Sequence, residues 1–500
     1  MAQLAEQTGV QIYFSDFFEV TPTLLEEYGA FDISLINDLP LFIDPFLLFN
    51  SRKPEYRRRH DDMIGYLRFL RDKSASSGIA PGLLRAWYQF SEVKQNWLGF
   101  SRFGNGGSGL GSDFASSLHQ NLATMFSNFG QEQVTRGSHL EKVCLISGGV
   151  GRDNISDFTT NLIKGYLLQY TQVFAQSHLP ADQRRIFNID KVRFNYTTET
   201  WERGRYELPH HGGDYVLLTP KDMLTRDEIW ISRRDLLNNF EQVAAAVPDE
   251  QLRAQLNNYL ASQLPLDPEG SAKEREREKQ RAIARALLAY PQIIEYYIRG
   301  KEDSGERAQA ISNEKVRETE MQFVEQLRHL VTQRLSGTAF YQYAGDTYAE
   351  ARERVLFLKH VIEDQDGYRI FYVDGKQIQR ESDLQLLYRL TWFATPSDVN
   401  REVNNGRGPV DFKLSRGSRD TSLVEFKLAS NSQLKRNLAN QVPIYEAAND
   451  TNKSLKVICY FSDTELAKVQ NILRELGQED NPGIILIDAR MDNKPSASKA

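Results

Sequence analysis

Short apolar runs alternate with amphipathic stretches through the C-terminal part of the chain, and this alternation constrains the fold more than any other feature. Runs of about four to eight apolar and β-branched residues between turn residues predict strands. These strands are expected at 409–414, 421–428, 455–461 and 483–488. Apolar residues at helical spacing predict helices at 383–393, 433–448 and 463–476. Helices and strands in this order favour an α/β domain with a central mixed sheet.

The rest of the 500-residue chain differs in character, so we interpret the whole as a multidomain α/β protein. Residues 1–265 are expected to form an α+β region that senses or positions a target. Residues 266–335 are expected to be a charged helical connector, because opposite charges fall three positions apart in its first part. Residues 336–490 hold the α/β domain, and 491–500 are a polar tail expected to be disordered.

Several further elements are predicted from local pattern alone. The connector ends in an amphipathic helix over 313–335, with Phe323, Leu327, Leu330, Val331 and Leu335 on one face. Strands are predicted at 139–147 and 367–373, a helix at 155–176, and a short helix that starts at Pro396-Ser397 and carries Glu402.

Composition excludes several classes of protein. The net charge of −6 excludes a generally basic nucleic-acid coat, so any nucleic-acid site must be a local basic patch. Only two cysteines are present, Cys144 and Cys459, which excludes a disulfide framework and favours a reducing compartment. The N-terminus shows no secretory pattern, and no stretch is apolar enough to span a bilayer. A cytoplasmic protein without a membrane partner is expected.

The residues that indicate chemistry lie on two neighbouring predicted strands. Asp411 is on the first, and Glu425-Phe426-Lys427 follows fourteen positions later on the second. Side chains two apart on a strand share a face, so Glu425 and Lys427 are expected to lie together, opposite Val424 and Phe426. A hairpin would bring Asp411 beside Glu425.

Two adjacent carboxylates repel each other unless a cation lies between them. Hard oxygen ligands favour Mg²⁺ or Mn²⁺, and Asp411 and Glu425 are the expected ligands. The lysine adds a positive charge that would stabilise an attacking hydroxide or a developing phosphorane. Such a set suits the hydrolysis of a phosphodiester bond.

This arrangement resembles the PD-(D/E)XK nuclease superfamily, which has the restriction-endonuclease-like fold. Pro409-Val410-Asp411 is a variant of its Pro-Asp pair, and Glu425-Phe426-Lys427 matches its Glu-x-Lys element. Glu402 matches the acidic residue that many members carry on a helix before the first strand. Gln441 and Tyr445 match the Gln-x-x-x-Tyr element of the RecB-like and lambda-exonuclease-like branch, although Pro443 lies inside it. The resemblance covers about 380–490.

The resemblance implies Mg²⁺- or Mn²⁺-dependent cleavage of nucleic acid, usually DNA. It assigns catalysis to Asp411, Glu425, Lys427, Glu402 and Gln441, and metal binding to the three acids among them. An endonuclease is the expectation, while exonucleolytic cutting and RNA as substrate stay open.

Local charge agrees with a nucleic-acid partner. Residues 401–440 hold eight lysines and arginines against four acids, in a chain that is acidic overall. The expected contacts to backbone phosphates are Arg407, Lys413, Arg416, Arg419, Lys435 and Arg436.

The large region before the nuclease-like domain resembles, by analogy, the effectors of microbial anti-phage defence or restriction systems. Residues 1–335 are expected to serve oligomerisation or a partner protein. Two alternatives stay open. The domain could bind nucleic acid through an inactive nuclease fold. The chain could also be an effector licensed by a nucleotide bound at Gly148-Gly149-Val150-Gly151-Arg152-Asp153, a turn before a helix.

Overall fold

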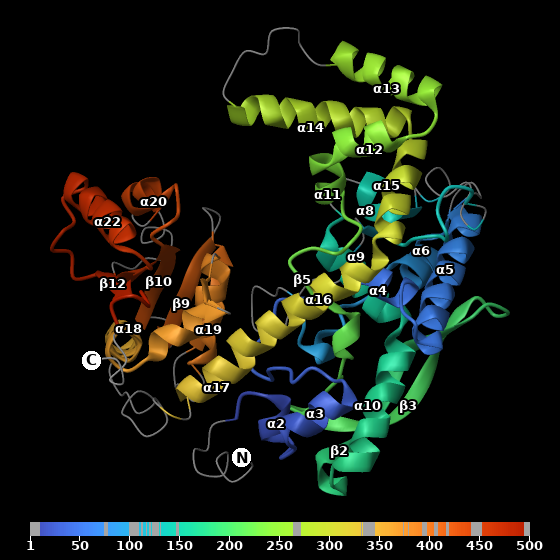
Figure 1. Ribbon diagram of the computed structural model, residues 1–500. Coiled ribbons are helices and arrows are strands. Elements are labelled where there is room, and N and C mark those ends of the chain that lie inside the picture. Colours follow the sequence, from blue (N-terminus) through green and yellow to red (C-terminus); the bar gives the residue numbers. More distant parts are fainter. Residues whose placement is uncertain are drawn as a thin grey trace.

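A continuous helical stretch joins the two main parts of the computed structural model (Figure 1). It runs through α16 (Gly305–Glu320), a π-helical turn η4 (Met321–Gln326) and α17 (Leu327–Leu330). Phe323 and Leu327 are fully buried and belong to a core cluster that draws residues from both parts. The Tyr13 hydroxyl donates a hydrogen bond to the carbonyl oxygen of Phe323, within the π-helical turn. The stretch is therefore packed into the core along one face.

The ranges that the structure describes are 11–74, 79–99, 110–111, 114–116, 118–119, 122, 130, 132–146, 150–263, 272–331, 333, 346–373, 375–378, 380–392, 398–404, 409–416, 420–441 and 453–494. Only the backbone is described for 272–277, 398–404, 409–410, 416 and 440–441.

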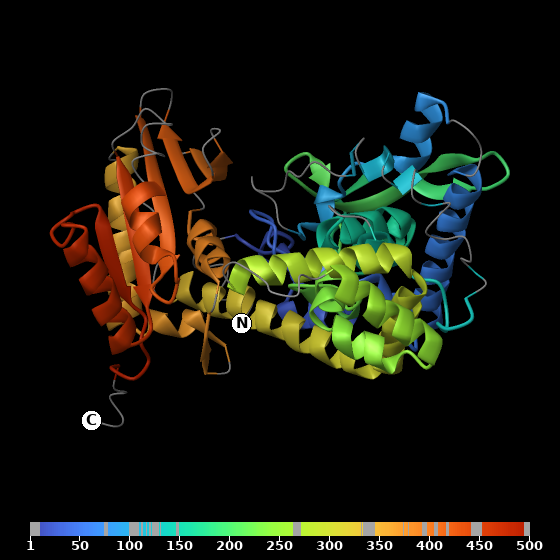
Figure 2. The same cartoon turned by 90° about the horizontal axis from the view of Figure 1, so that it is seen from above.

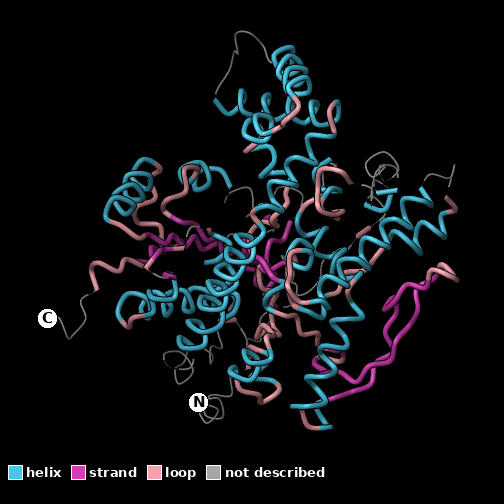
Figure 3. The backbone as a smooth tube through the Cα atoms, turned by 45° about the vertical axis from the view of Figure 1, so that its right-hand side comes forward, coloured by secondary structure: helices cyan, strands magenta, loops and turns pink. Residues whose placement is uncertain are grey.

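The N-terminal part combines many helices with two small sheets. Its elements up to Arg226 are α2 (Phe14–Phe17), α3 (Pro22–Tyr28), β1 (Leu41–Ile43), α4 (Pro45–Phe49), α5 (Pro54–Ser74), α6 (Pro81–Tyr88), η1 (Lys94–Asn96), α8 (Lys142–Ile146), α9 (Arg152–Leu162), α10 (Lys164–His178), η2 (Ala181–Gln183), β2 (Arg184–Asn195), β3 (Thr200–His211), β4 (Asp214–Tyr215), η3 (Lys221–Met223) and β5 (Leu224–Arg226). Strand β1 pairs antiparallel with β5, and β2, β3 and β4 form a second antiparallel sheet. The β2–β3 hairpin is the long strand pair at the edge of the molecule (Figure 3).

A helical layer follows in the chain and leads into α16. It consists of α11 (Arg233–Asn238), α12 (Phe240–Ala246), α13 (Glu250–Gln263), α14 (Ala272–Ala289) and α15 (Gln292–Asp303). Ile283 and Leu287 on α14 are buried against this layer, and Lys279 pairs with Glu241 on α12 at 2.7 Å. Where its side chains are described, α14 therefore buries an apolar face and leaves Glu278 and Arg281 exposed.

The C-terminal part is built around one mixed sheet. Its elements are α18 (Thr347–Asp364), η7 (Gly367–Phe371), β6 (Tyr372–Val373), β7 (Lys376–Gln377), α19 (Glu381–Leu390), β8 (Asp398–Asn404), β9 (Pro409–Arg416), β10 (Asp420–Leu428), α20 (Leu434–Arg436), η8 (Asn437–Gln441), β11 (Ser454–Tyr460), α22 (Asp463–Glu475) and β12 (Ile484–Asp488). The five-stranded order is β12-β11-β10-β9-β8. The β8, β9 and β10 strands are antiparallel neighbours, whereas β10, β11 and β12 run parallel.

Helices cover both faces of this sheet (Figure 2). Alternate residues of β11 show the two layers: Val457 belongs to the core cluster that contains α18 and α19, whereas Ile458 packs with Leu434 on α20 and Val469 on α22. This strict alternation follows from the two-residue period of a strand.

The predicted mixed α/β class is confirmed, and most elements of the C-terminal part lie where the pattern predicts them. The strands predicted at 409–414, 421–428, 455–461 and 483–488 correspond to β9, β10, β11 and β12. The helices predicted at 383–393 and 463–476 correspond to α19 and α22. In the N-terminal part the helix predicted at 155–176 is confirmed as α9 and α10, which are divided at Ile163.

Three local predictions are wrong. Residues 142–146 form the helix α8 and not a strand, because a short apolar run does not distinguish a buried strand from a buried helical turn. Of the strand predicted at 367–373, only Tyr372–Val373 is a strand, and Gly367–Phe371 form a 3-10 turn. A side chain at Gly367 would lie 2.8 Å from the carbonyl oxygen of Val361, so the chain turns tightly against the end of α18. Glu402 lies in the strand β8, not on a short helix, because Val399 and Val403 pair with the neighbouring strand β9.

The predicted domain boundary and the predicted C-terminal tail are only partly covered by the described residues. The boundary predicted at 335–336 and the residues 495–500 lie outside the described ranges. The segment up to Lys494 is held against the domain, because Asn493 donates a hydrogen bond of 2.8 Å to Asp488 and Lys494 pairs with the same carboxylate at 3.4 Å. The first residues of the predicted disordered tail are therefore ordered. Across the described ranges, every helix is too short or too polar to cross a membrane.

Candidate active site

The hairpin of β9 and β10 places Asp411 beside Glu425. The antiparallel pairing runs from Asp420 opposite Arg416 to Val424 opposite Phe412, so the next position brings Asp411 level with Glu425. The regular ladder ends at this point. The amide N–H of Phe426 donates instead to Oδ2 of Asp411 at 2.6 Å, and the amide N–H of Asp411 donates to Oε2 of Glu425 at 3.4 Å. Side-chain carboxylates thus replace strand-to-strand bonds at the site.

The two faces of the hairpin separate charge from apolar surface. Phe412 and Phe426 belong to the core cluster, and their rings lie 5.3 and 4.6 Å from the ring of Tyr388 on α19. Because side chains alternate along a strand, Glu425 and Lys427 lie on the opposite face from Phe426. The aromatic packing therefore fixes which way the charged residues point.

Lys427 is surrounded by carboxylates. Its ammonium nitrogen lies 3.0 Å from Oε1 of Glu425 and 3.8 Å from Oδ2 of Asp411, and it donates a hydrogen bond of 2.9 Å to the carbonyl oxygen of Phe426. A third carboxylate, Oε2 of Glu381, lies 3.3 Å from the same nitrogen. All of these interactions hold the lysine in one place.

Glu381 is a residue of this site that the sequence did not predict. It is the first residue of α19, and it also accepts hydrogen bonds from Asn431 Nδ2 at 2.6 Å and from the amide of Leu428 at 3.4 Å. The sequence pattern predicts this helix at 383–393, so Glu381 falls two positions before its expected start, and Glu402 is the acid matched to this role. Acids are favoured at helix N-termini, so position alone did not mark Glu381 as functional.

The charged side chains of this cluster are almost completely buried. Asp411, Glu425 and Lys427 are only 8%, 8% and 7% exposed. Burial and then the charge of Glu425 raise the pKa of Asp411 to about 8, while Lys427 opposes the shift. Burial also raises the pKa of Glu425. Burial alone would lower the pKa of Lys427, but the charges of Asp411, Glu425 and Glu381 outweigh it and raise that pKa.

The charges of the cluster do not balance. Three carboxylates face one ammonium, so two negative charges remain when all the groups are ionised. Carboxylate oxygens in this number fit a divalent cation such as Mg²⁺. Within the described part of the chain, however, no three histidine, cysteine, aspartate or glutamate side chains already form a metal-binding group. The Lys427 ammonium lies within 4 Å of both the Asp411 and the Glu425 carboxylate.

Two other predicted catalytic residues are placed only by their backbone. Arg401 pairs with Phe412 and Val403 with Val410, so Glu402 on β8 falls level with Asp411 on β9. Gln441 is the last residue of η8, the π-helical turn after α20. The side chains of Glu402 and Gln441 are outside the described part, as is Tyr445 together with the second half of the helix predicted at 433–448.

The predicted phosphate-binding residues differ in exposure and in whether they already form an ion pair. Lys413 is half-buried, two positions along β9 from Asp411, and Arg436 is exposed on α20. Lys435 pairs with Glu475 on α22 at 2.5 Å, so its charge is partly neutralised. Arg416 is the last residue of β9 and its side chain is not described, whereas Arg407 and Arg419 fall outside the described ranges altogether.

A second lysine lies next to the site and was not predicted. Lys456 on β11 is level with Glu425 in the parallel pairing with β10, and it is 7% exposed. Residues level with each other on parallel strands point to the same face of a sheet. Lys456 therefore lies on the same face of the sheet as Glu425 and Lys427, on the neighbouring strand.

Two stretches of the chain match known family models. Residues 19–232 match a family described as a domain of unknown function, DUF8370. Residues 347–463, which include Asp411, Glu425, Lys427 and Glu381, match a second domain of unknown function, DUF8371. The search of curated proteins gave no match, and the search of solved structures also gave none.

Proposed function

We propose that the chain is a Mg²⁺-dependent nuclease that hydrolyses phosphodiester bonds of DNA. The observation that carries this proposal is the position of Lys427, whose ammonium lies within 4 Å of Asp411, Glu425 and Glu381. A buried lysine held among acids at the edge of a hairpin provides both charges that phosphodiester hydrolysis needs.

The order of elements supports the same proposal. An acid on a helix, an Asp on a strand, Glu-x-Lys on the next strand and a following helical segment occur in turn as Glu381, Asp411, Glu425 with Lys427, and α20 with η8. This is the order that the resemblance to the PD-(D/E)XK nucleases requires. Glu381 on α19 replaces Glu402 as the helical acid in this proposal.

Asp411 and Glu425 would hold the metal ion, with Glu381 near enough to orient its surroundings. When bound, Mg²⁺ would supply positive charge to the phosphate under attack. Without a cation, burial and the charge of Glu425 raise the pKa of Asp411, so metal binding would be coupled to the loss of its proton.

Lys427 acts on the phosphate itself. Its ammonium stays charged because the neighbouring carboxylates raise its pKa, and it is fixed by the carbonyl oxygen of Phe426. A fixed charge that needs no rearrangement stabilises the pentavalent transition state more than a mobile one.

Cleavage tests the proposal. Supercoiled, linear and single-stranded DNA and RNA are incubated with the full chain in Mg²⁺, Mn²⁺ or EDTA. We expect metal-dependent loss of DNA, with nicked and linear plasmid showing internal cutting. Absence of cutting by folded protein on every substrate and with both metals contradicts the proposal.

One observation favours the alternative of a binding module with an inactive nuclease fold. Lys427 lies 3.0 Å from Glu425, and the described residues contain no ready-made group of three metal ligands. A protein of this kind would bind DNA in EDTA and in Mg²⁺ with equal affinity and cut it in neither. A gel-shift measurement beside the cleavage assay separates the two functions.

A further inference from the structure

A cavity of about 500 Å³ lies in the N-terminal part, far along the chain from the candidate active site. Its walls come from the end of α8, the start of α9, the loop before α11, α11 itself and α14. Cavities of this size hold small organic ligands in other proteins. The residues that line it include three arginines, three apolar side chains and two amide side chains.

Three arginines line the cavity: Arg152, Arg233 and Arg234. The guanidinium of Arg152 packs over the ring of Phe42 at 4.7 Å, and Arg233 donates a hydrogen bond of 2.8 Å to the carbonyl oxygen of Leu145. Arg234 is exposed at the start of α11. Two of the three guanidinium groups are thus held in fixed orientations, as a phosphate-binding site requires.

The acids in the cavity offset this charge only partly. Asp153 and Glu228 also line it, and burial raises the pKa of both carboxyls against the lowering effect of Arg152. Three arginines facing two such acids leave an excess of positive charge. This excess of positive charge favours the binding of an anion.

The helix α9 begins at the same cavity. Gly151 is the residue that caps its N-terminus, and a side chain at Gly151 would meet no atom within 4 Å. An eleven-residue helix adds positive potential at this end. Val150, Gly151, Arg152 and Asp153 are the described residues of the turn that the sequence singles out as a nucleotide candidate.

Part of the wall is apolar, with Val150, Ile229 and Leu237. Asn238 and Gln280 place amide groups beside it. An apolar wall with amide donors and acceptors suits a flat heterocycle, because its faces need apolar contact and its edges need hydrogen bonds.

We propose that this cavity binds a nucleoside polyphosphate, with the phosphates on Arg152, Arg233 and Arg234 and the base against Ile229 and Leu237. The inference does not depend on the nuclease activity proposed for the C-terminal part. It rests on the cavity, its three arginines and its apolar wall.

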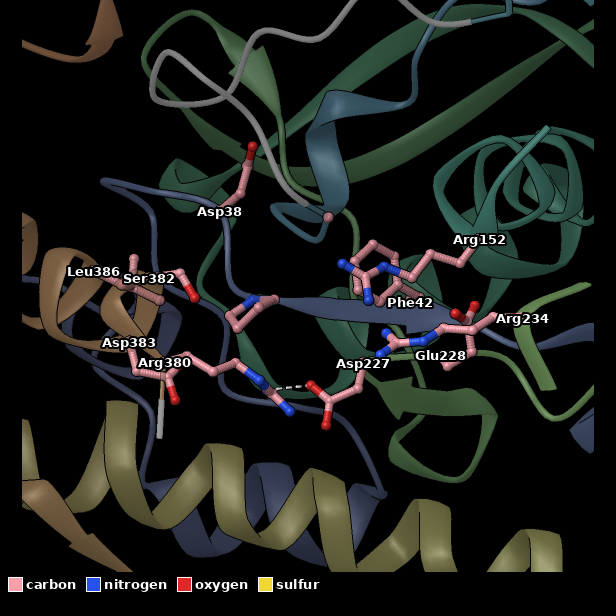
Figure 4. Close-up of a pocket in the computed structure, with 12 residues that line it drawn as sticks. Asp38, Phe42, Arg152, Asp227, Glu228, Arg234, Arg380, Ser382, Asp383 and Leu386 are labelled. Atoms are coloured by element: carbon pink, nitrogen blue, oxygen red, sulfur yellow. Dashed lines mark hydrogen bonds and ion pairs between the residues drawn. The ribbon is translucent and has the colours of Figure 1, made fainter. Parts of the chain in front are cut away.

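The site adjoins a second, smaller cavity of about 170 Å³ (Figure 4). Arg152, Glu228 and Arg234 line both cavities. The smaller one extends to Arg380 and Ser382, which flank Glu381 on either side in the chain. Figure 4 shows the guanidinium of Arg380 paired with Asp227 between the two parts of the molecule. The nucleotide site thus lies next to the helix that carries a residue of the candidate active site.

The proposal is tested by isothermal titration calorimetry of the full chain with ATP, GTP, CTP and UTP in EDTA. We expect saturable binding of at least one of the four. Arg234→Ala and Asn238→Asp should each weaken it by about tenfold, because the first removes a charged partner and the second adds a repelling charge. Arg57→Ala, an exposed arginine on α5, is the matched control and should leave the affinity unchanged.

Each contrary result overturns the proposal. If none of the four nucleotides binds saturably at millimolar concentration, the cavity is not a nucleotide-binding site. Equal affinity in Arg234→Ala, Asn238→Asp and Arg57→Ala places the nucleotide elsewhere. Inorganic triphosphate that binds as tightly as the best nucleotide excludes a role for the apolar wall.

Discussion

The ammonium of Lys427 lies 3.3 Å from a carboxylate oxygen of Glu381, although the two residues are 46 positions apart in the chain. Glu381 begins the helix α19 and Lys427 is near the end of the strand β10. Asn431 donates a second hydrogen bond to the same carboxylate, at 2.6 Å. The contact therefore joins a helix, a strand and the loop after it at one buried point.

Replacing Glu381 by Gln should lower the rate of DNA cleavage by about 10- to 100-fold. The amide keeps the shape and the contact with Asn431 but removes one of the charges that hold Lys427. The rate is measured on plasmid at saturating Mg²⁺. Glu475→Gln is the control, because Glu475 is exposed and pairs only with Lys435 in the described structure. Equal cleavage rates for the two variants would show that Glu381 is not part of the active site.

Replacing Lys427 by Met should lower the free energy of unfolding by about 3–5 kcal/mol in the absence of metal. The change leaves Asp411, Glu425 and Glu381 close together without their shared cation. Ca²⁺ should then raise the melting temperature of this variant more than that of the wild type, because it supplies the missing charge. Thermal unfolding with and without Ca²⁺ measures both effects.

The control for that prediction is Lys435→Met, which removes an exposed ion pair and should change stability by less than about 1 kcal/mol. If Ca²⁺ stabilises the Lys427 variant no more than this control, the three carboxylates do not form a cation site.

The pKa of Asp411 predicts how stability varies with pH. Its ordinary value is 3.8 and its value in the folded protein is about 8, because burial and Glu425 disfavour the charged form. The folded state therefore holds a proton that the unfolded state has lost, and this contribution to stability is present at low pH and disappears as the pH rises from about 4 to about 8. Asp411→Asn cannot lose that proton, so its stability should fall less over the same range.

Denaturant unfolding of the wild type and Asp411→Asn at a series of pH values, without metal, measures this difference. Parallel stability curves for the two proteins would show that Asp411 is ionised normally in the folded state.

A second buried ion pair holds α19 against the N-terminal part. Arg226 at the end of β5 lies 2.6 Å from Asp383, and their side chains are 6% and 9% exposed. Arg226→Met should cost about 3–5 kcal/mol of stability, because Asp383 then stays buried without a partner. The double variant Arg226→Met/Asp383→Leu should recover most of that loss. A double variant that is as unstable as the single one would mean that the pair does more than neutralise charge.

The sequence predicts the charged face of the hairpin because that face depends on local rules. Alternation along β9 and β10 and a short turn suffice to bring Asp411, Glu425 and Lys427 together. Glu381 could not be predicted in this way, because its contact with Lys427 depends on how α19 packs across the end of the sheet. No local pattern encodes that packing.

The wrong predictions have a similar cause. Val399 and Val403 alternate as in a strand, but Pro396-Ser397 resembles a helix start and outweighed them. The short apolar run in α8 has no period that separates helix from strand. In the N-terminal part, β1 and β5 pair across more than 180 positions, from Leu41 to Arg226, and such contacts are invisible to short windows of sequence.

The most direct test of the account is plasmid cleavage by Glu425→Gln and Glu475→Gln, measured side by side with the wild type in Mg²⁺ and in EDTA. We predict that the wild type and Glu475→Gln cut at equal rates in Mg²⁺, that EDTA stops both, and that folded Glu425→Gln does not cut. Cleavage by Glu425→Gln at the wild-type rate would contradict the assignment of the active site.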